Sequence, residues 1–469
     1  MIYLKRFSAA LLMSFLGTAC TAQAEKAEDT YKKNCASCHG NKMQGGLGGA
    51  LLGKPWKYGG TDADIARVIT TGIAEKGMPA WKNALSDEDI RALIIYMREV
   101  GAKTNSDAQL KSLQPTEGVF STKHHKFKLE KLVGGFGVLW ALDFLPDGSM
   151  LVSERDGILW RIKAGEKTKV MGTPKVWANT QGGLLDIAVK QDDGNNPWVY
   201  LSYSQPSSNG AMTAVVRGKI KNNQFVDSQI IFQADEKFHT KKGYHFGSRI
   251  VLDKGYIFFS VCDRGDQQQA QDLSRPNGKI HRLFDDGRTP EDNPFVKTPE
   301  AIKSIWSYGS RNPQGMVLSH NGLLWEAEHG PRGGDEVNII EKGVNYGWPS
   351  ITYGMNYDGT AITNKTSAPG MAQPKHYWVP SIAVTAIDEY SGSAFPSWSH
   401  HLLVGSLAKQ ELQLLEVKGT EVMSSELLLK NQGRIRDLVV GSDGLIYLAM
   451  NPDGEKGSAI YRLVPAAKM

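Results

Sequence analysis

The pattern of apolar and polar positions changes character about a hundred residues into the chain. Between residues 61 and 100, apolar residues recur at the three- and four-residue spacing of amphipathic helices. One predicted helix begins after its cap Thr61. A second begins after Ser86 and ends at Gly101. The first part of the chain is therefore predicted to be a small all-α domain.

From residue 119 onward, short apolar runs alternate with tight turns such as Pro146–Gly148 and Ser442–Gly444, a pattern typical of strands. Six similar strand–turn–strand units follow one another. They begin near Trp140, Leu184, His245, Arg311, Ile382 and Arg434. Spacings of roughly 45 to 70 residues suit propeller blades with inserted loops. The alternative is a pair of β-sandwiches, but six repeated units favour an all-β six-bladed propeller.

The amino terminus has the features of a secretory signal. Lys5 and Arg6 precede an apolar run over 7–19, and Ala22–Ala24 is a small-x-small cleavage site. The run is too short to span a bilayer, so an uncleaved anchor is the weaker alternative, as is a lipid anchor at Cys20. We expect an exported, periplasmic protein with no membrane span.

Four segments follow from these patterns. Residues 1–24 are the predicted signal peptide, and 25–103 the helical domain. Residues 104–118, rich in Lys, Asn, Ser, Gln and Pro, are the predicted linker, and 119–469 the β domain.

Charge and cysteine content exclude some functions. The formal net charge is +5, and it falls to +3 once a leader containing Lys5 and Arg6 is removed. No basic stripe is interleaved with aromatic residues, so we expect no nucleic-acid partner. The four cysteines form no disulfide framework.

The segment Cys35-Ala36-Ser37-Cys38-His39 carries the clearest chemistry. Two thiols on one helical turn can each add to a haem vinyl group, and His39 then binds the iron as the proximal ligand. A thioredoxin-like redox pair would need a βαβ context, and a zinc site would need a second ligand pair. The motif predicts one covalently attached haem c.

The sixth iron ligand is expected between the two predicted helices. Met78 lies in a loop from which a thioether can reach inward, whereas Met97 is assigned to helix core and Met43 lies too near the proximal loop. With these motifs, residues 28–100 resemble class I cytochrome c. His/Met ligation implies a haem that transfers electrons.

Polar segments in the β domain begin or end predicted strands, so their side chains could converge at one mouth of a central channel. These segments are 244–249 (YHFGSR), 311–315 (RNPQG), 329–336 (HGPRGGDE) and 433–437 (GRIRD). With them, nearly the whole domain resembles the soluble quinoprotein glucose dehydrogenase and aldose sugar dehydrogenase family, which uses pyrroloquinoline quinone (PQQ). Further matches are 140–148, 181–186, 195–197, 265–266, 270–272 and 345–349.

The resemblance implies roles for individual residues. His245 would be the base that takes the hydroxyl proton, a task suited to its near-neutral pKa. Arg311, with Asn312 beside it, would stabilise negative charge on the quinone oxygen. Arg434 and Arg436 lie two apart on a predicted strand, so they share a face, and they would pair with the cofactor carboxylates.

The resemblance also implies a calcium ion on the main-chain carbonyls of Gly330 and Pro331, a hard cation acting as a Lewis acid. Asp335 and Glu336 are nearby carboxylates, and the sequence fits equally well with their lying in a solvent-exposed turn. Gln181 and the pair Asp263-Arg264 would line the substrate side.

Three positions depart from the glucose dehydrogenase pattern. His329 replaces a glutamine before the calcium carbonyls, and Cys262 replaces a glycine. Ala408 occupies the place of an expected lysine, so Lys409 is displaced by one position. If Lys409 cannot turn inward, one cofactor contact is lost.

Together these features predict a dehydrogenase that oxidises an aldose sugar or a related alcohol. Electrons would pass singly from PQQ to the fused haem and then to an external acceptor such as a soluble cytochrome or copper protein. One alternative is a non-catalytic propeller that binds a glycan or protein. The other, a nitrite reductase with a d-type haem, would need eight blades and a second axial histidine.

Overall fold

The computed structural model describes residues 26–52, 56–112, 115, 117–191, 194, 196–452 and 457–466, without the side chains of 104–112. The predicted signal peptide, 1–24, lies outside the described residues. Contacts divide the chain into two compact units. The first contains the chain as far as Asp107 together with Pro331–Gly333 and Gly354–Asn364, and the second contains the rest.

The described amino-terminal part of the first unit is helical. Residues 26–34 form a helix. The other helices are α2 (Ala36–His39), α3 (Asp62–Thr71), the 3-10 helix η1 (Ala74–Lys76) and α4 (Asp87–Ser112). Both predicted caps are present. Thr61 and Asp64 form a reciprocal capping box at α3, and Ser86 and Asp89 make the same exchange at α4.

The expected end of the second helix at Gly101 is wrong, because α4 continues to Ser112. A single glycine costs a helix only about 1 kcal/mol. The residues that follow include Ala102, Lys103, Gln109 and Leu110, which are good helix formers, and no proline occurs before Pro115. The first part of the predicted linker is therefore helical.

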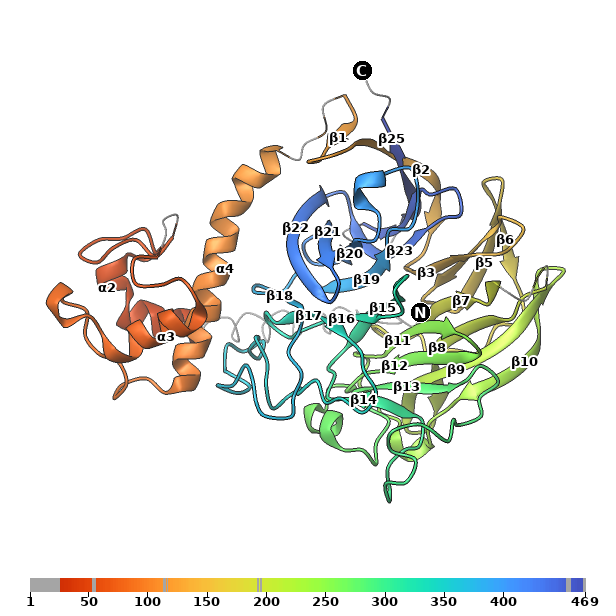
Figure 1. The fold of residues 1–469 in the computed structure, drawn as a ribbon, viewed down its shortest axis with the longest axis horizontal. Helices are drawn as coiled ribbons and strands as arrows, with labels where there is room; N and C mark the ends of the chain where they lie inside the picture. Colours follow the sequence, from red (N-terminus) through yellow and green to blue (C-terminus); the bar gives the residue numbers. More distant parts are fainter. Residues whose placement is uncertain are drawn as a thin grey trace, which may run out of the picture. The chain divides into compact units, whose positions relative to one another are not determined.

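The second unit contains six antiparallel sheets (Figure 1). The first is β3 (Leu139–Phe144), β4 (Met150–Glu154), β5 (Ile158–Lys163) and β6 (Glu166–Val170). The second is β7 (Leu184–Val189), β8 (Val199–Ser207), β9 (Gly210–Lys221) and β10 (Gln224–Phe232). The third is β11 (Gly247–Asp253), β12 (Tyr256–Val261), β13 (Lys279–Phe284) and β14 (Ile305–Tyr308).

The fourth sheet is β15 (Pro313–Leu318), β16 (Leu324–Glu328), β17 (Asp335–Ile339) and β18 (His376–Trp378). The fifth is β19 (Val384–Glu389), β20 (Leu402–Ser406), β21 (Glu411–Lys418) and β22 (Glu421–Lys430). The sixth joins β23 (Arg434–Val440), β24 (Ile446–Asn451) and β25 (Ser458–Pro465) to β2 (Lys126–Phe136) and β1 (Val119–Ser121). Short 3-10 helices lie in the loops: η3 (Glu236–Phe238), η4 (Gln267–Gln271) and η5 (Pro396–Trp398).

The six sheets form a closed ring, so the predicted six-bladed propeller is confirmed. The first strand of each sheet contacts the first strand of the next, and β23 contacts β3. These six strands begin within a few residues of the predicted starting points. The ring is closed by β2, which pairs antiparallel with β25 although the two strands come from opposite ends of the domain.

Each pair of neighbouring sheets encloses an apolar core. Between the first two sheets, for example, Leu151 and Leu159 pack with Leu184 and Leu201, all fully buried. This follows from strands that are buried on both faces, such as β7, in which every residue is buried. Burial of this kind stabilises each interface by about 25 cal/mol per Å² of apolar surface.

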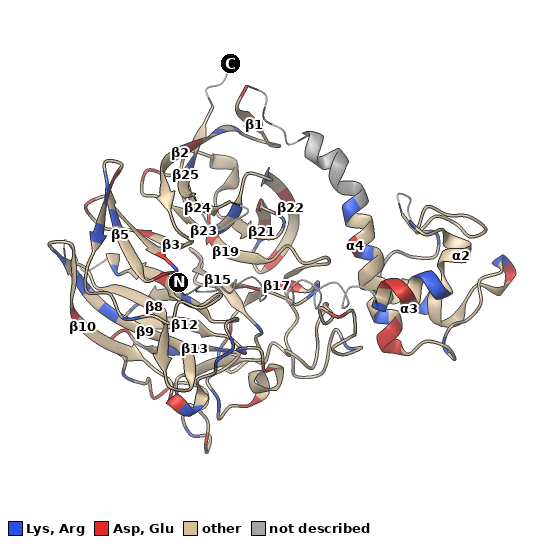
Figure 2. Ribbon diagram, turned by 180° about the vertical axis from the view of Figure 1, so that it is seen from behind, with Lys and Arg blue, Asp and Glu red and all other residues tan. Residues whose placement is uncertain are grey.

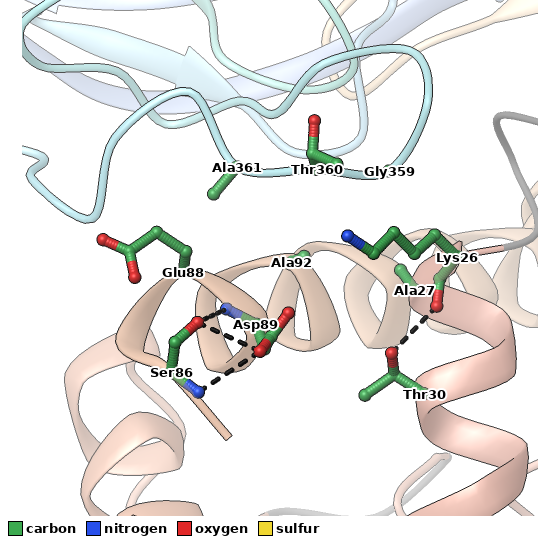
Figure 3. A pocket seen from close by; sticks show the side chains of 10 residues that line it. All are labelled: Lys26, Ala27, Thr30, Ser86, Glu88, Asp89, Ala92, Gly359, Thr360 and Ala361. Carbon is green, nitrogen blue, oxygen red and sulfur yellow. Dashed lines mark hydrogen bonds between the residues drawn. The ribbon is translucent and has the colours of Figure 1, made fainter. Parts of the chain in front are cut away.

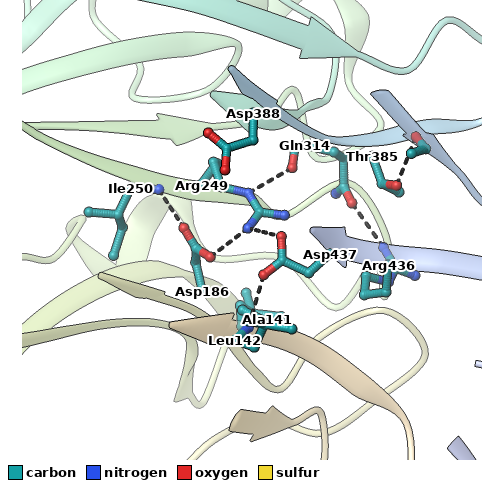
Figure 4. A network of polar contacts seen from close by, with 12 residues as sticks. Ala141, Leu142, Asp186, Arg249, Ile250, Gln314, Thr385, Asp388, Arg436 and Asp437 are labelled. Carbon is teal, nitrogen blue, oxygen red and sulfur yellow. Dashed lines mark hydrogen bonds and ion pairs between the residues drawn. The ribbon is translucent and has the colours of Figure 1, made fainter. Parts of the chain in front are cut away.

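A charged network holds the inner strands together at the centre of the ring (Figure 4). Arg249 Nη1 donates to Asp186 Oδ1 at 2.8 Å and to Asp437 Oδ1 at 2.7 Å. The second oxygens accept from neighbouring backbones, Asp186 from Ile250 N at 2.6 Å and Asp437 from Leu142 N at 2.9 Å. Charged side chains in this network therefore connect four different blades, a role that apolar packing between adjacent sheets cannot fill.

Basic and acidic side chains are interspersed along the ribbon in both units (Figure 2). Among the described residues, none of the helices combines the length and apolarity needed to cross a bilayer.

Candidate functional site

The haem-binding motif lies on α2 in the first unit. His39 N and Gly40 N donate to Cys35 O and Ala36 O, which places both cysteines and the histidine on one helical turn. The ring of His39 is fixed by a contact of 2.8 Å between Nδ1 and Gly49 O. A carbonyl accepts only, so Nδ1 carries the proton and the lone pair of Nε2 is free for a metal, the usual arrangement of a metal-binding histidine.

The two cysteines do not have the character of a redox pair. Burial, followed by the neighbouring Cys38, raises the pKa of the Cys35 thiol to about 11. Dithiol oxidoreductases instead lower the pKa of their attacking cysteine. Of the three methionines considered, Met43 and Met97 are buried in the helical core, whereas Met78 lies partly buried at its edge. This leaves Met78 the best placed to bind an iron, and its ligation stays a prediction.

In the propeller, His245 is held by its backbone and by one carboxylate. Its backbone lies in the left-handed region, with φ of 57°, and its N–H donates to Gln181 Oε1 at 2.9 Å. Nδ1 lies 2.7 Å from Asp263 Oδ1. Asp263 is fully buried, and its Oδ2 accepts from Trp348 Nε1 at 3.0 Å. Because an ionised carboxylate only accepts, Nδ1 carries the proton and Nε2 is the basic nitrogen, with its lone pair facing Arg311 Nη2.

The electrostatics keep His245 neutral at pH 7. Burial, and then the adjacent Arg311, lower its pKa below 6.5, while Asp263 opposes both effects. Arg311 Nη2 lies 3.3 Å from His245 Nε2, and its Nη1 donates to His329 O at 2.9 Å and to Gly330 O at 3.0 Å. A neutral imidazole beside a fixed cation is suited to take a proton from a hydroxyl group whose oxygen develops negative charge.

The guanidinium groups of Arg434 and Arg436 belong to the same charged region. Burial, and then repulsion by Arg434, Arg249 and Arg155, lower the pKa of Arg436 to about 9. Arg436 Nη1 donates to Gln314 Oε1 at 3.0 Å, but its buried Nε has no partner among the described residues. A buried donor and mutually repelling cations fit an anionic ligand, and carboxylates suit arginine best.

His329 lies among these cations. Its pKa is held well below the usual value, first by burial and then by Arg311, Arg436, His245 and Arg434 in that order. The imidazole is therefore neutral at pH 7. Although His329 replaces a glutamine of the family pattern, this neutral imidazole adds no charge to the site.

Cys262, for which the sequence offered no explanation, positions Asn312. Its Sγ donates to Asn312 Oδ1 at 2.8 Å, and burial keeps the pKa of the thiol well above its ordinary value. Asn312 Oδ1 is thereby held toward β12, and no described residue accepts from its amide nitrogen. Gly247 leaves room for the sulfur, since a Cβ there would lie 2.6 Å from it.

Two predicted site residues, Arg264 and Lys409, make no described hydrogen bond with the guanidinium groups of the site. Arg264 is 1% exposed, and it donates to the backbone carbonyls of Tyr244, Lys242 and Ala211. These hydrogen bonds hold the backbone of residues 242–244, directly before His245, in place. The side chain of Lys409 makes no hydrogen bond or ion pair with any described residue, while its backbone N–H donates to Ile382 O at 3.3 Å.

The predicted calcium region contains a cluster of buried acids. Asp335 lies in β17 and not in a solvated turn, and both its oxygens are occupied, for example by Gly330 N at 2.9 Å and Ile382 N at 2.8 Å. Glu328 and Glu336 line one small cavity together with Arg311 and Gly330. Burial raises the pKa of Glu336 to about 7 and that of Glu328 well above its usual value.

Buried carboxylates of this kind fit a hard cation, which prefers oxygen ligands. The placement of calcium on the carbonyls of Gly330 and Pro331 stays a prediction.

A separate pocket lies within the first unit (Figure 3). It is lined by Lys26, Ala27, Thr30, Ser86, Glu88, Asp89, Ala92, Gly359, Thr360 and Ala361. Its hydroxyl groups already have partners, since Thr30 donates to Lys26 O, Ser86 caps α4 and Thr360 donates to Asp358 Oδ1. None of the predicted site residues lines it.

Comparison with known proteins follows the division into two parts. The profile described as Glucose / Sorbosone dehydrogenase matches residues 136–462. The chain belongs to this family. A second profile, described as cytochrome C oxidase, cbb3-type, subunit III, matches residues 22–97, so the amino-terminal part contains a cytochrome c domain. This family member is therefore an oxidoreductase with a cytochrome c domain joined to its propeller.

Individual relatives agree with this assignment. Aldose sugar dehydrogenase YliI of Escherichia coli (strain K12) is 42% identical over 320 residues, covering 66% of this chain and 86% of that protein. The apo-form crystal structure of the soluble aldose sugar dehydrogenase from Escherichia coli matches with a TM-score of 0.68 and 37% identity. It covers 72% of this chain and 100% of that one.

The structure of the PQQ-bound form of aldose sugar dehydrogenase from Streptomyces coelicolor matches with a TM-score of 0.61 and 25% identity. It covers 74% of this chain and 100% of that one. The sugar dehydrogenase family predicted from the sequence is thus confirmed.

Proposed function

We propose that this protein is an exported, periplasmic, PQQ-dependent dehydrogenase that oxidises the hemiacetal carbon of an aldose to a lactone. The observation that carries the proposal is the neutral His245, oriented by Asp263, next to Arg311 and an excess of guanidinium groups. The PQQ-bound relative from Streptomyces coelicolor supports the choice of cofactor.

The buried charges suit this cofactor. Arg434 and Arg436 would hold its carboxylates, and Asn312, positioned by Cys262, would donate an amide hydrogen to one of its oxygens. Glu328 and Glu336 offer buried carboxylate oxygens beside Gly330, and with the Gly330 carbonyl they would support calcium. When bound, PQQ would supply a carbonyl carbon that accepts a hydride.

The protein's own side chains would accept the hydroxyl proton and stabilise the negative charge that develops on oxygen. The sugar C1 loses one hydride and its hydroxyl group loses one proton, so two electrons leave the substrate and a C=O bond forms. His245 Nε2 takes the proton, and Asp263 stabilises the resulting imidazolium across the 2.7 Å contact. Arg311, always cationic, stabilises negative charge on an oxygen beside it.

The cytochrome domain gives the electrons a route out. A haem accepts one electron at a time, so two transfers are needed for each sugar. A haem c ligated by His39 and Met78 in the α-helical part of the same chain would receive them at a high effective concentration. The final acceptor would be an external one-electron carrier such as a soluble cytochrome or a copper protein.

Reconstitution tests this function. Purified haem-containing protein is mixed with PQQ and calcium, a panel of aldoses and alcohols is added, and reduction of the haem is followed by its absorption. We expect reduction by at least one aldose only when PQQ is present. If the haem is never reduced although an artificial dye is, the intramolecular route is wrong. If neither is reduced, the dehydrogenase assignment is wrong, which favours a binding propeller.

A further inference from the structure

Three metal-ligating side chains meet at a point that the proposed reaction does not use. His320 lies in the turn between β15 and β16, Glu389 ends β19, and His400 precedes β20. One ligand atom from each lies within 4.8 Å of the other two. We infer that these three residues form a binding site for a transition-metal ion, of which zinc is the best example, between the fourth and fifth blades.

The carboxylate of this cluster is already fixed in place. The Glu389 side chain is 8% exposed. Its Oε2 accepts from the backbone N–H of His320 at 2.7 Å, and its Oε1 lies 2.7 Å from His320 Nδ1. A buried carboxylate whose two oxygens both face one residue is strongly oriented. Little side-chain entropy therefore remains to be lost when a metal binds.

The second imidazole is positioned by its backbone. His400 lies in the left-handed region with φ of 62°, and its N–H donates to Tyr390 O at 2.8 Å. Tyr390 directly follows Glu389, so this bond ties His400 to the strand that carries the carboxylate. The rings of His320 and His400 lie 3.9 Å apart between centroids, tilted by 40°.

The donor set selects the class of metal. Two imidazoles and one carboxylate suit zinc, which takes three protein ligands and a water in open sites, and they do not suit calcium, which requires six or more oxygens. Zinc would take the place of the proton between His320 Nδ1 and Glu389 Oε1 and would add a nitrogen of His400. The neutral His320 ring would then carry its single proton on Nε2, so binding needs a change of tautomer and no net release of a proton.

The location separates this site from the proposed catalytic centre. Arg311 precedes the first residue of β15 and His320 follows its last, so about one strand length, roughly 20 Å, lies between them. The metal would instead connect a turn of the fourth blade to the end of β19 and to the loop before β20 in the fifth blade. Its effect would be to stabilise this part of the ring and not to take part in sugar oxidation.

Calorimetric titration with zinc chloride tests the site, using the full-length haem-containing protein in excess calcium so that oxygen-rich sites are filled. We expect one zinc equivalent with micromolar or tighter affinity. His320→Gln and His400→Gln should each weaken it by at least about 100-fold, the upper range for loss of groups that support a metal. Glu389→Gln should weaken it as well. His124→Gln removes an exposed histidine outside the cluster and should bind like the wild type.

A second readout is thermal unfolding of the propeller, since a ligand that binds only the folded state raises its midpoint temperature. Zinc should raise this temperature in the wild type and in His124→Gln, but not in the His320→Gln/His400→Gln double variant. Equal zinc stoichiometry in the wild type and the double variant would overturn the inference. Loss of binding in His124→Gln alone would also overturn it, because the ion would then be elsewhere.

Discussion

Replacement of Asp263 by asparagine tests the assignment of His245 as the base. Asp263 accepts from His245 and from Gly265 N on one oxygen, and from Trp348 on the other. An asparagine has a single acceptor oxygen, so its amide N–H must face the donors on one of these two sides. If the amide nitrogen turns to His245, it donates to Nδ1 and moves the ring proton to Nε2, where it blocks the basic lone pair.

The size of the effect follows from the burial of this pair. Removing one partner of a buried charged contact costs about 3 to 5 kcal/mol, and each tenfold change in rate corresponds to about 1.36 kcal/mol. For Asp263→Asn we therefore expect kcat to fall about 10²- to 10⁴-fold. An exposed carboxylate gives the matched control: Asp235→Asn, with a side chain 72% exposed, should leave kcat unchanged.

The pH profile gives a second, independent readout. The pKa of His245 lies below 6.5 in the wild type. As the pH drops through this lowered pKa, the base becomes protonated and kcat/KM should fall. Asp263 raises the pKa of His245. Its removal should therefore move this acidic limb to still lower pH, while His245→Gln should abolish the limb.

The assay is dye reduction by the reconstituted enzyme with a saturating aldose, with folding checked by circular dichroism. Because Asp263 acts through His245, adding Asp263→Asn to His245→Gln should cost little further activity. A folded Asp263→Asn enzyme with wild-type kcat and an unmoved acidic limb would refute the assigned roles. So would fully multiplicative losses in the double variant.

Three further variants test other parts of the structure. Cys262→Ala removes the donor to Asn312 and should weaken PQQ binding about threefold to tenfold by titration, while Cys262→Ser, which keeps a donor, should bind nearly normally. Gly48→Ala places a Cβ 2.9 Å from His39 Cε1, so it should shift the haem midpoint potential or reduce haem content. Arg249→Met leaves two buried carboxylates without their cation and should destabilise the propeller by about 3 to 5 kcal/mol in urea unfolding.

Each of these has an outcome that contradicts it. Equal PQQ affinity in the alanine and serine variants would mean that the thiol does not position Asn312. An unchanged potential and haem content in Gly48→Ala would show that the proximal ring is not confined by that glycine. An unfolding midpoint for Arg249→Met equal to that of the wild type would show that the central ion pairs contribute no net stability.

The ring of blades could be predicted because its signals are local. Alternating apolar residues and tight turns such as Pro146–Gly148 lie within each strand pair, so the six first strands were found close to their observed positions. The closing strand β2 could not be assigned to the sixth sheet in this way. Its partner β25 lies more than 300 residues away in sequence, and no local pattern records such a pairing.

The site was predictable in part for the same reason. His245 and Arg311 were identified from motifs, but the partnership of His245 with Asp263 depends on a contact across 18 residues. The only local sign was a carboxylate placed just after a buried strand. Arg264, next to it in sequence, belongs instead to the backbone support, and sequence adjacency gave no means of separating the two roles.

The pairing of β2 with β25 has a consequence for how the protein is made. The last blade is completed only when β2 pairs with β25, and β25 follows all the other strands of the propeller in the chain. A nascent chain that already carries Cys35 and His39 therefore still lacks a place for any ligand shared by Arg311 and Arg436. Deletion of β25 (Ser458–Pro465) would remove none of these side chains, yet the ring could not close and the pocket would not form.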